Sequence, residues 1–143
     1  MNTTTLKTAT VTTSIGLFLF SLSQKCYCTS ASGCGDSLAV LLTGWMGVFT
    51  GTASTFPWLA NPAIALGWIR IFKHEKESLI ESIVAAALCF SFLFFDEIIN
   101  DEGGHYSKIT GYKIGYWAWA GSAILLLTGN VICAYLRKKA VKL

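Results

Sequence analysis

The chain has 143 residues, 53% of them hydrophobic and 13% charged, and a mean hydropathy of +0.54. This composition is typical of an integral membrane protein, and the length suits one compact unit rather than two domains. The formal charge of +3 comes from cations at the ends of apolar runs, without a basic patch that contains aromatics, which disfavours nucleic-acid binding. We expect a single transmembrane helical domain over residues 1–143, with the lipid bilayer as its partner.

The first apolar segment, about residues 8–23, is the weakest of four. Polar residues at 10–14 dilute it, and its dense apolar part is limited to 15–22. An uncleaved span would use the whole segment, whereas a cleavable signal peptide would need only the short apolar part, with Lys7 before it and small residues near its end. Both interpretations are open, and we favour the uncleaved span.

Three of the five cysteines, Cys26, Cys28 and Cys34, follow this segment. If their loop faces an oxidising compartment, we expect a disulfide from Cys34 to Cys26 or Cys28. Free thiols are the second interpretation. Metal binding has the least support, because the loop has no histidine and its spacing matches no strong zinc pattern.

The second apolar region, 37–72, is too long for one span, since 36 helical residues measure about 54 Å against about 30 Å of hydrocarbon. Its two prolines lie in PWLANP, 57–62, and disfavour a continuous helix. Asn61 before Pro62 resembles an N-cap followed by a proline at the first helical position. We expect a helix to about residue 56, a break, and a helix from Pro62 to about Lys73. One piece crosses, and the other is re-entrant or lies in the interface.

The third and fourth apolar segments are the clearest. The third covers 78–95 and carries Glu81 near its start, and the fourth covers 115–136 without a charged residue. Each helix would cross a hydrocarbon core of about 30 Å. Aromatic rings at 116–119 mark one end of the fourth segment, and cations from Arg137 onward mark the other.

The distribution of cations predicts the orientation. With the amino terminus inside and one net crossing per segment, eight of the 11 Lys and Arg residues lie inside. The other three, Lys25, Lys108 and Lys113, lie outside, as the positive-inside rule requires. We therefore predict an all-α bundle with four net crossings, a proline-broken helix at 57–62 and both termini in the cytoplasm.

Few residues are candidates for a site. In the outer loop 96–113, Asp101, Glu102 and His105 are weak candidates for a metal site, but calcium-loop spacing is absent and we expect a solvated loop and no bound metal. The weak candidates for binding are Asn61, Glu81 and Asn130.

Each binding candidate also has an ordinary structural interpretation. Asn61 would cap a helix, and Asn130 would form hydrogen bonds between helices. Glu81 would reach the interface and meet Lys76 or Lys73. These polar residues do not line up across several helices as a proton relay requires.

Small residues at helical spacing predict close packing of helices in lipid. The sets are Gly47 with Gly51, Ser78 with Ser82 and Ala86, and Gly121 with Gly129. Such motifs are common, so they indicate a packed bundle rather than a specified dimer.

PWLANP at 57–62, followed by an apolar helix with basic residues, and KITGYKIGYWAWAGSAILLL at 108–127 look like signatures of small bacterial four-helix integral membrane proteins of unassigned function. The resemblance covers roughly residues 36–136 and implies a compact helical bundle in a bacterial inner membrane, with no activity to carry over. It also implies that PWLANP belongs to a crossing helix, with residues 44–51 as the re-entrant piece.

Sequence motifs of hydrolases, phosphate-binding loops and dinucleotide-binding folds are absent. We therefore expect a protein without its own catalysis or cofactor, acting as an accessory, regulatory or structural component. The alternative is a subunit of an oligomeric transporter or channel, in which the break at 57–62 lines the site. Either function would involve a homo-oligomer or a membrane protein partner.

Overall fold

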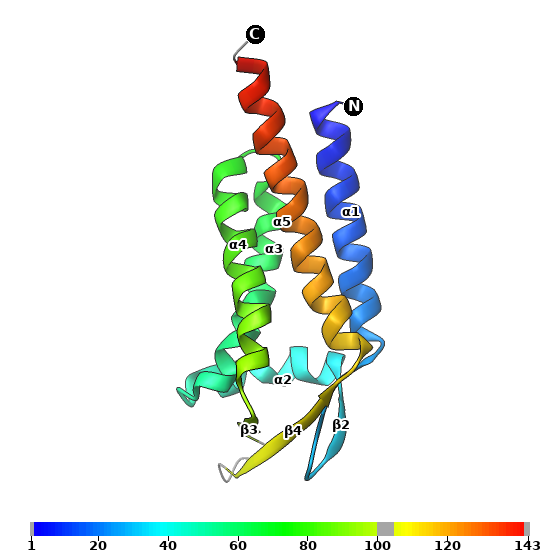
Figure 1. Cartoon of the computed structure of the whole chain (residues 1–143), viewed down its shortest axis with the longest axis vertical. Coiled ribbons are helices and arrows are strands. Elements are labelled where there is room, and N and C mark those ends of the chain that lie inside the picture. Colours follow the sequence, from blue (N-terminus) through cyan, green and yellow to red (C-terminus); the bar gives the residue numbers. More distant parts are fainter. Residues whose placement is uncertain (1, 100–104, 142–143) are drawn as a thin grey trace.

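The computed structural model describes residues 2–99 and 105–141 (Figure 1). The α-helices are α1 (Thr3–Leu22), α2 (Ser37–Phe49), α3 (Ala60–Arg70), α4 (Glu75–Ser91) and α5 (Ile114–Val141). Two 3₁₀ helices, η1 (Ala53–Leu59) and η2 (Phe92–Phe94), precede α3 and follow α4. The strands are β1 (Lys25–Thr29), β2 (Gly33–Asp36), β3 (Glu97–Ile99) and β4 (Tyr106–Tyr112).

Four helices, α1, α3, α4 and α5, run along the long axis of the molecule and form a bundle. The strands and α2 lie at one end of it, with α2 lying across the bundle axis (Figure 1). The start of α1 and the end of α5 lie together at the opposite end. We call the two ends the sheet end and the terminal end.

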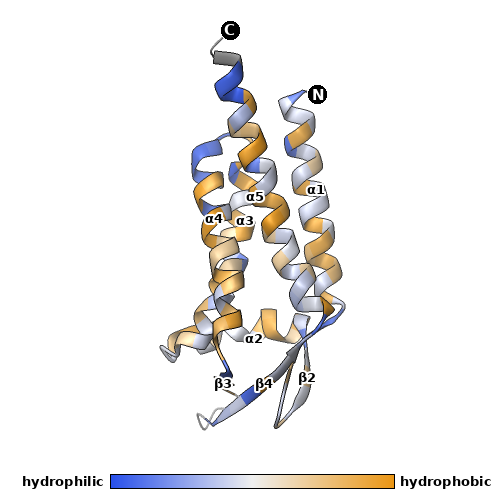
Figure 2. Ribbon diagram, in the orientation of Figure 1, coloured by the Kyte–Doolittle hydropathy of each residue, from blue (hydrophilic) through white to orange (hydrophobic). Residues whose placement is uncertain are grey.

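Three helical segments are long and apolar enough to cross a membrane: Thr3–Leu22, Glu75–Phe94 and Ile114–Lys139. They match the first, third and fourth predicted segments, so the prediction of a mostly helical chain with helices able to span a membrane is confirmed. Figure 2 shows hydrophobic residues along the middle of α4 and α5 and in the second half of α1, whose first half is pale, with hydrophilic residues at the terminal end and on the strands. By contrast, α3 has 11 residues, which make about 16 Å of helix and fall short of the bilayer core.

The prediction that the chain is all-α is wrong, because the sheet end contains a four-stranded antiparallel sheet in the order β2-β1-β4-β3. Its central pair joins both predicted outer loops, with Tyr27 opposite Tyr112 and Thr29 opposite Ile109. These partners are far apart in sequence, so hydropathy along the chain carried no signal of their pairing. In the described parts of both loops, the strand pairing satisfies backbone hydrogen-bonding groups within the protein.

The predicted break at 57–62 is also misplaced. Helix α2 ends at Phe49, and the chain reverses at Gly51, which has a φ of +71° that favours glycine. The Thr55 hydroxyl donates to the Gly47 carbonyl at 2.8 Å, so the Gly47 and Gly51 pair serves this reversal. Pro57 lies inside η1, which continues directly into α3. Pro62 lies in the first turn of α3, where a missing N–H costs little.

Helices α1 and α5 pack closely through the polar residues that had weakened the first predicted span. Gly129 of α5 lies against the Thr10 side chain, so closely that a Cβ at position 129 would overlap it. The buried Ser14 hydroxyl donates to the Ser122 carbonyl at 2.8 Å and accepts from the Trp68 indole at 2.9 Å. Thr10 and Ser14 therefore face the protein, whereas Thr12 and Thr13 are exposed, as are the apolar side chains of Leu19 and Phe20.

The core lies where α3, α4 and α5 meet, and the small residues on α4 belong to it. Its largest fully buried apolar side chains are Ile64, Ile71, Leu126, Cys89 and Cys133. Ser78 and Ser82 are fully buried on α4, and the Ser78 hydroxyl lies 2.8 Å from the Gly67 carbonyl of α3. The predicted small-residue stripes thus allow contacts within one molecule.

We predict that Gly129→Ala lowers the apparent unfolding temperature in detergent, because the new methyl group overlaps Thr10. Overpacking of this kind costs about 1–3 kcal/mol, which exceeds the gain in helix propensity of about 1 kcal/mol. Gly16→Ala is the matched control, since a Cβ at position 16 of α1 meets nothing within 4 Å. A thermal unfolding series in which both variants are equally stabilised would contradict this packing.

Candidate functional site

A cavity of about 630 Å³ lies at the sheet end, between α2, η1, the end of α1 and the start of α5. Its volume is within the range of small-molecule sites. Its walls come from segments far apart in the sequence, which the fold alone brings together. Its lining residues include Cys26, Tyr27, Ser37, Val40, Ser54, Pro57, Trp58, Asn61, Phe92, Tyr116 and Trp119.

The segment 57–62 contributes Pro57, Trp58 and Asn61 to this wall. Asn61 does not cap a helix as expected, because α3 begins one residue earlier, at Ala60. Its amide nitrogen donates to the Trp58 carbonyl at 2.9 Å, and its oxygen accepts from the Trp119 indole at 2.8 Å. Asn61 therefore ties the start of α3 to α5 at the edge of the cavity.

The walls are apolar and neutral. The described residues that line the cavity include no Asp, Glu, Lys, Arg or His. The Ser37 and Ser54 hydroxyls, from α2 and η1, are buried and have no hydrogen-bond partner within the described chain. A buried hydroxyl without a partner costs free energy, so both positions favour a ligand that supplies one.

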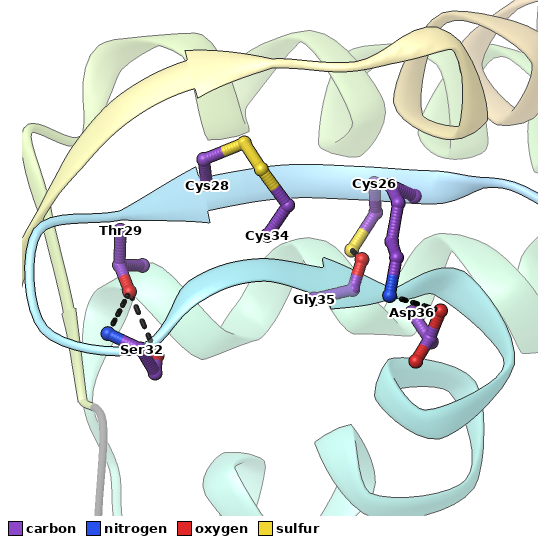
Figure 3. The surroundings of a disulfide bond; sticks show 8 residues. Cys26, Cys28, Thr29, Ser32, Cys34, Gly35 and Asp36 are labelled. Carbon is purple, nitrogen blue, oxygen red and sulfur yellow. Dashed lines mark hydrogen bonds and ion pairs between the residues drawn. A yellow bond between two sulfur atoms is a disulfide. The ribbon is translucent and has the colours of Figure 1, made fainter.

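A disulfide joins Cys28 to Cys34, one of the two pairings that the sequence left open. The two residues face each other in the β1–β2 hairpin (Figure 3). The Cys26 thiol is free and buried, and it donates to the Gly35 carbonyl at 3.3 Å. Burial raises the pKa of Cys26, so its thiol stays protonated and unreactive at neutral pH.

The metal candidates are not assembled by the described part of the fold. Asp101 and Glu102 lie outside the described residues, and His105 is exposed just before β4. Across residues 2–99 and 105–141, no group of three His, Cys, Asp or Glu side chains could hold a metal ion. The described parts of this loop form β3 and β4 rather than an extension of α4.

Ion pairs connect all four bundle helices at the terminal end. The half-buried carboxylate of Glu75 on α4 binds Lys7 of α1 at 2.5 Å and Arg137 of α5 at 3.1 Å. Glu81 pairs with Arg70 of α3 at 2.5 Å, rather than with Lys76 or Lys73 as expected. The α3–α4 hairpin sets this choice, because it places the last residue of α3 opposite the second turn of α4.

Asn130 is buried between α5 and α4, where it takes part in hydrogen bonds between helices. Its oxygen lies 3.1 Å from the Ser78 hydroxyl, and its nitrogen lies 3.4 Å from both the Ser78 carbonyl and the Ser82 hydroxyl. Asn61, Glu81 and Asn130 lie in three different parts of the structure and do not form a common site. Asn61 lies at the cavity, Glu81 at the terminal end, and Asn130 in the α4–α5 seam.

Sequence reasoning missed Ser37 and Ser54. Serine is common in membrane helices and loops, and only the tertiary structure shows that these two hydroxyls are buried without partners. The sequence predicts Trp119 as an interfacial anchor, and in the structure its indole N–H also donates to Asn61. An aromatic residue in the membrane often needs a partner for its N–H, and that is the signal that could have pointed to Asn61.

Comparisons with protein families, with curated proteins and with solved structures found no match to this chain.

We predict that Asn130→Leu lowers the free energy of unfolding by about 1 kcal/mol, because α4 loses its hydrogen-bond partner on α5. Leucine has the same branched arrangement of four side-chain heavy atoms and is no smaller, so the substitution leaves no cavity. Thr128→Leu is the control, since Thr128 is exposed on the same helix. Equal unfolding free energies for the two variants, measured by denaturation in mixed micelles, would refute a stabilising role for Asn130.

Proposed function

We propose that this chain is a bacterial inner-membrane protein with four net crossings and both termini in the cytoplasm, acting as a non-catalytic accessory, regulatory or structural component. The observation that carries this proposal is the use of its polar interior. Ser14, Asn61 and Asn130 each bond to a neighbouring helix, so they hold the bundle together rather than present reactive groups. A packed bundle of this kind suits a protein that supports or regulates another.

The fourth crossing is assigned to η1 and α3 together. Helix α3 runs antiparallel to α4 beside it and returns the chain from the sheet end to the terminal end (Figure 1). Its own length is short for a bilayer, but η1 precedes it without a break. Since α1, α4 and α5 account for three crossings, this piece makes the number even, which matches the common position of the two chain ends.

The charge distribution supports the orientation. The described Lys and Arg residues at the terminal end are Lys7, Arg70, Lys73, Lys76, Arg137, Lys138 and Lys139. Those at the sheet end are Lys25, Lys108 and Lys113. An excess of cations marks the cytoplasmic side, and the Cys28–Cys34 disulfide suits an oxidising compartment on the other side.

We further propose that α1 stays in the mature protein as a span. Its contacts with α5, through Thr10 and Ser14, are those of an integral bundle helix. Removing α1 would expose the Ser122 carbonyl and the groove at Gly129 to lipid.

A second candidate function is that of a transporter or channel subunit. The cavity favours it, because the proline-containing segment 57–62 lines it. Irregular backbone at a membrane cavity is a feature of transporter binding sites.

Thiol labelling tests the orientation. In spheroplasts treated with an impermeant reductant, we expect an impermeant maleimide to label Cys28 and Cys34, because their disulfide lies at the sheet end. The control is Lys139→Cys, at the terminal end, in a Cys28→Ser/Cys34→Ser background. Labelling of that cysteine before the membrane is permeabilised would reverse the proposed orientation.

Co-purification and flux together test the role. After cross-linking in a native host, we expect one membrane protein partner or a second copy of the chain to co-purify in fixed ratio. Proteoliposomes that contain the purified protein alone should show no ion or solute flux above empty vesicles. A flux that Asn61→Ala abolishes and Ser91→Ala preserves would replace the accessory role with the transport role.

A further inference from the structure

We propose that the cavity at the sheet end binds an uncharged single-chain lipid with a hydroxyl or ester head, of the monoacylglycerol type. The proposal rests on the membrane location proposed above, and it adds a ligand to the accessory role. Three properties of the cavity carry it: neutral walls, unpartnered buried hydroxyls, and a position at the membrane interface.

The neutral walls exclude a charged head group. An ion transferred into a cavity without a counter-charge loses its hydration and gains no partner, which costs several kcal/mol. None of the described lining residues carries a charge. Fatty acids and phospholipids therefore fit this cavity less well than a molecule without charge.

The apolar body of the ligand would lie against aromatic side chains. Tyr27, Trp58, Phe92, Tyr116 and Trp119 all line the cavity. The indole N–H groups of both tryptophans already donate hydrogen bonds, Trp58 to the Leu41 carbonyl at 3.0 Å and Trp119 to the Asn61 side-chain oxygen at 2.8 Å. Their ring surfaces therefore remain as apolar contacts for an acyl chain.

The two serine hydroxyls would bind the head. Ser37 is 9% exposed and Ser54 is 5% exposed, and neither hydroxyl has a well-formed hydrogen bond within the described chain. Beside Ser37 lies the Cys26 thiol, which is only a weak hydrogen-bonding group. Each can donate one hydrogen bond and accept others. Hydroxyl and ester oxygens of a neutral lipid would satisfy both, which a pure hydrocarbon would not.

The cavity lies at the level where such a lipid resides. Tyr116 and Trp119 belong to the aromatic cluster at the start of α5, and such rings favour the headgroup layer. Helix α2 forms another wall and contains no charged residue. Its exposed apolar side chains are Leu38, Leu42, Trp45, Met46 and Phe49. We place α2 in the interface because it lies across the bundle axis at the sheet end (Figure 1) with these apolar side chains exposed, so a ligand can enter from the bilayer.

Photolabelling in phosphatidylcholine nanodiscs tests the proposal. The probe is a monoacylglycerol with a diazirine in its chain, and the charged comparison is the corresponding fatty acid at pH 8. We expect the neutral probe to label the cavity segments within residues 37–61 and 115–119, and excess monooleoylglycerol to prevent it. Labelling spread evenly over lipid-facing helices, or equal labelling by the fatty acid, would overturn the proposal.

Serine variants give a sharper readout. Ser37→Ala and Ser54→Ala should each weaken competition by monooleoylglycerol about fivefold, the equivalent of one hydrogen bond. Neither should lower the unfolding temperature of the lipid-free protein, because each removes an unpartnered hydroxyl. Ser91→Ala is the control, since its hydroxyl bonds within its own helix and does not line the cavity.

Val40→Phe provides a second test, because the larger side chain fills part of the cavity. Labelling should be lost in this variant and kept in Ser91→Ala. If all four variants are labelled like the unchanged protein, the lipid does not occupy this cavity. A protein with the proposed thiol accessibility but no competed labelling would overturn this inference alone and leave the proposed topology intact.

Discussion

The close approach of α5 to its neighbours is the interaction on which the rest of the structure depends. Gly129 admits the side chain of Thr10 from α1, Asn130 binds α4, and Trp119 binds the start of α3 through Asn61. In a bilayer, apolar side chains gain little free energy when they move from lipid to a helix interface, because both are apolar. Close packing at small residues and hydrogen bonds between helices must therefore drive helix association. One helix therefore fixes the positions of the other three.

The sheet end shows how this bundle supports a more varied structure. Strand β1 follows the end of α1 and strand β4 leads into the start of α5, so the packing of these helices brings the strands together. The Cys28–Cys34 disulfide joins the two strands of the β1–β2 hairpin, and α2 lies across the bundle axis at the same end of the molecule. The cavity lies at their junction, with the two unpartnered serine hydroxyls in its walls. The ion pairs of Glu75 and Arg70 stabilise the other end.

The sequence predicted the spans near 78–95 and 115–136 closely, because twenty apolar residues form a strong local signal. It misplaced the break at 57–62, because Pro57 and Pro62 are strong local signals, whereas the helical run ends at Gly51 through a left-handed φ that the sequence does not reveal. The predicted partner of Glu81 was also wrong, because a salt bridge across a helical hairpin depends on how the two helices align. The sequence predicted a helix-capping role for Asn61, and it gave no signal that Trp119 would be its partner.

By itself, the sequence determined that this protein has helices able to cross a membrane, where the two clearest of them lie, and on which sides of them its cations fall. Hydropathy and charge are read residue by residue, and the bilayer imposes a fixed length on them. Only the tertiary structure decided the strand pairing, the choice of Cys28 as partner for Cys34, and the cavity beneath α2. Each of these depends on contacts between segments that are distant in the chain, and hydropathy and charge along the chain do not specify which distant segments will meet.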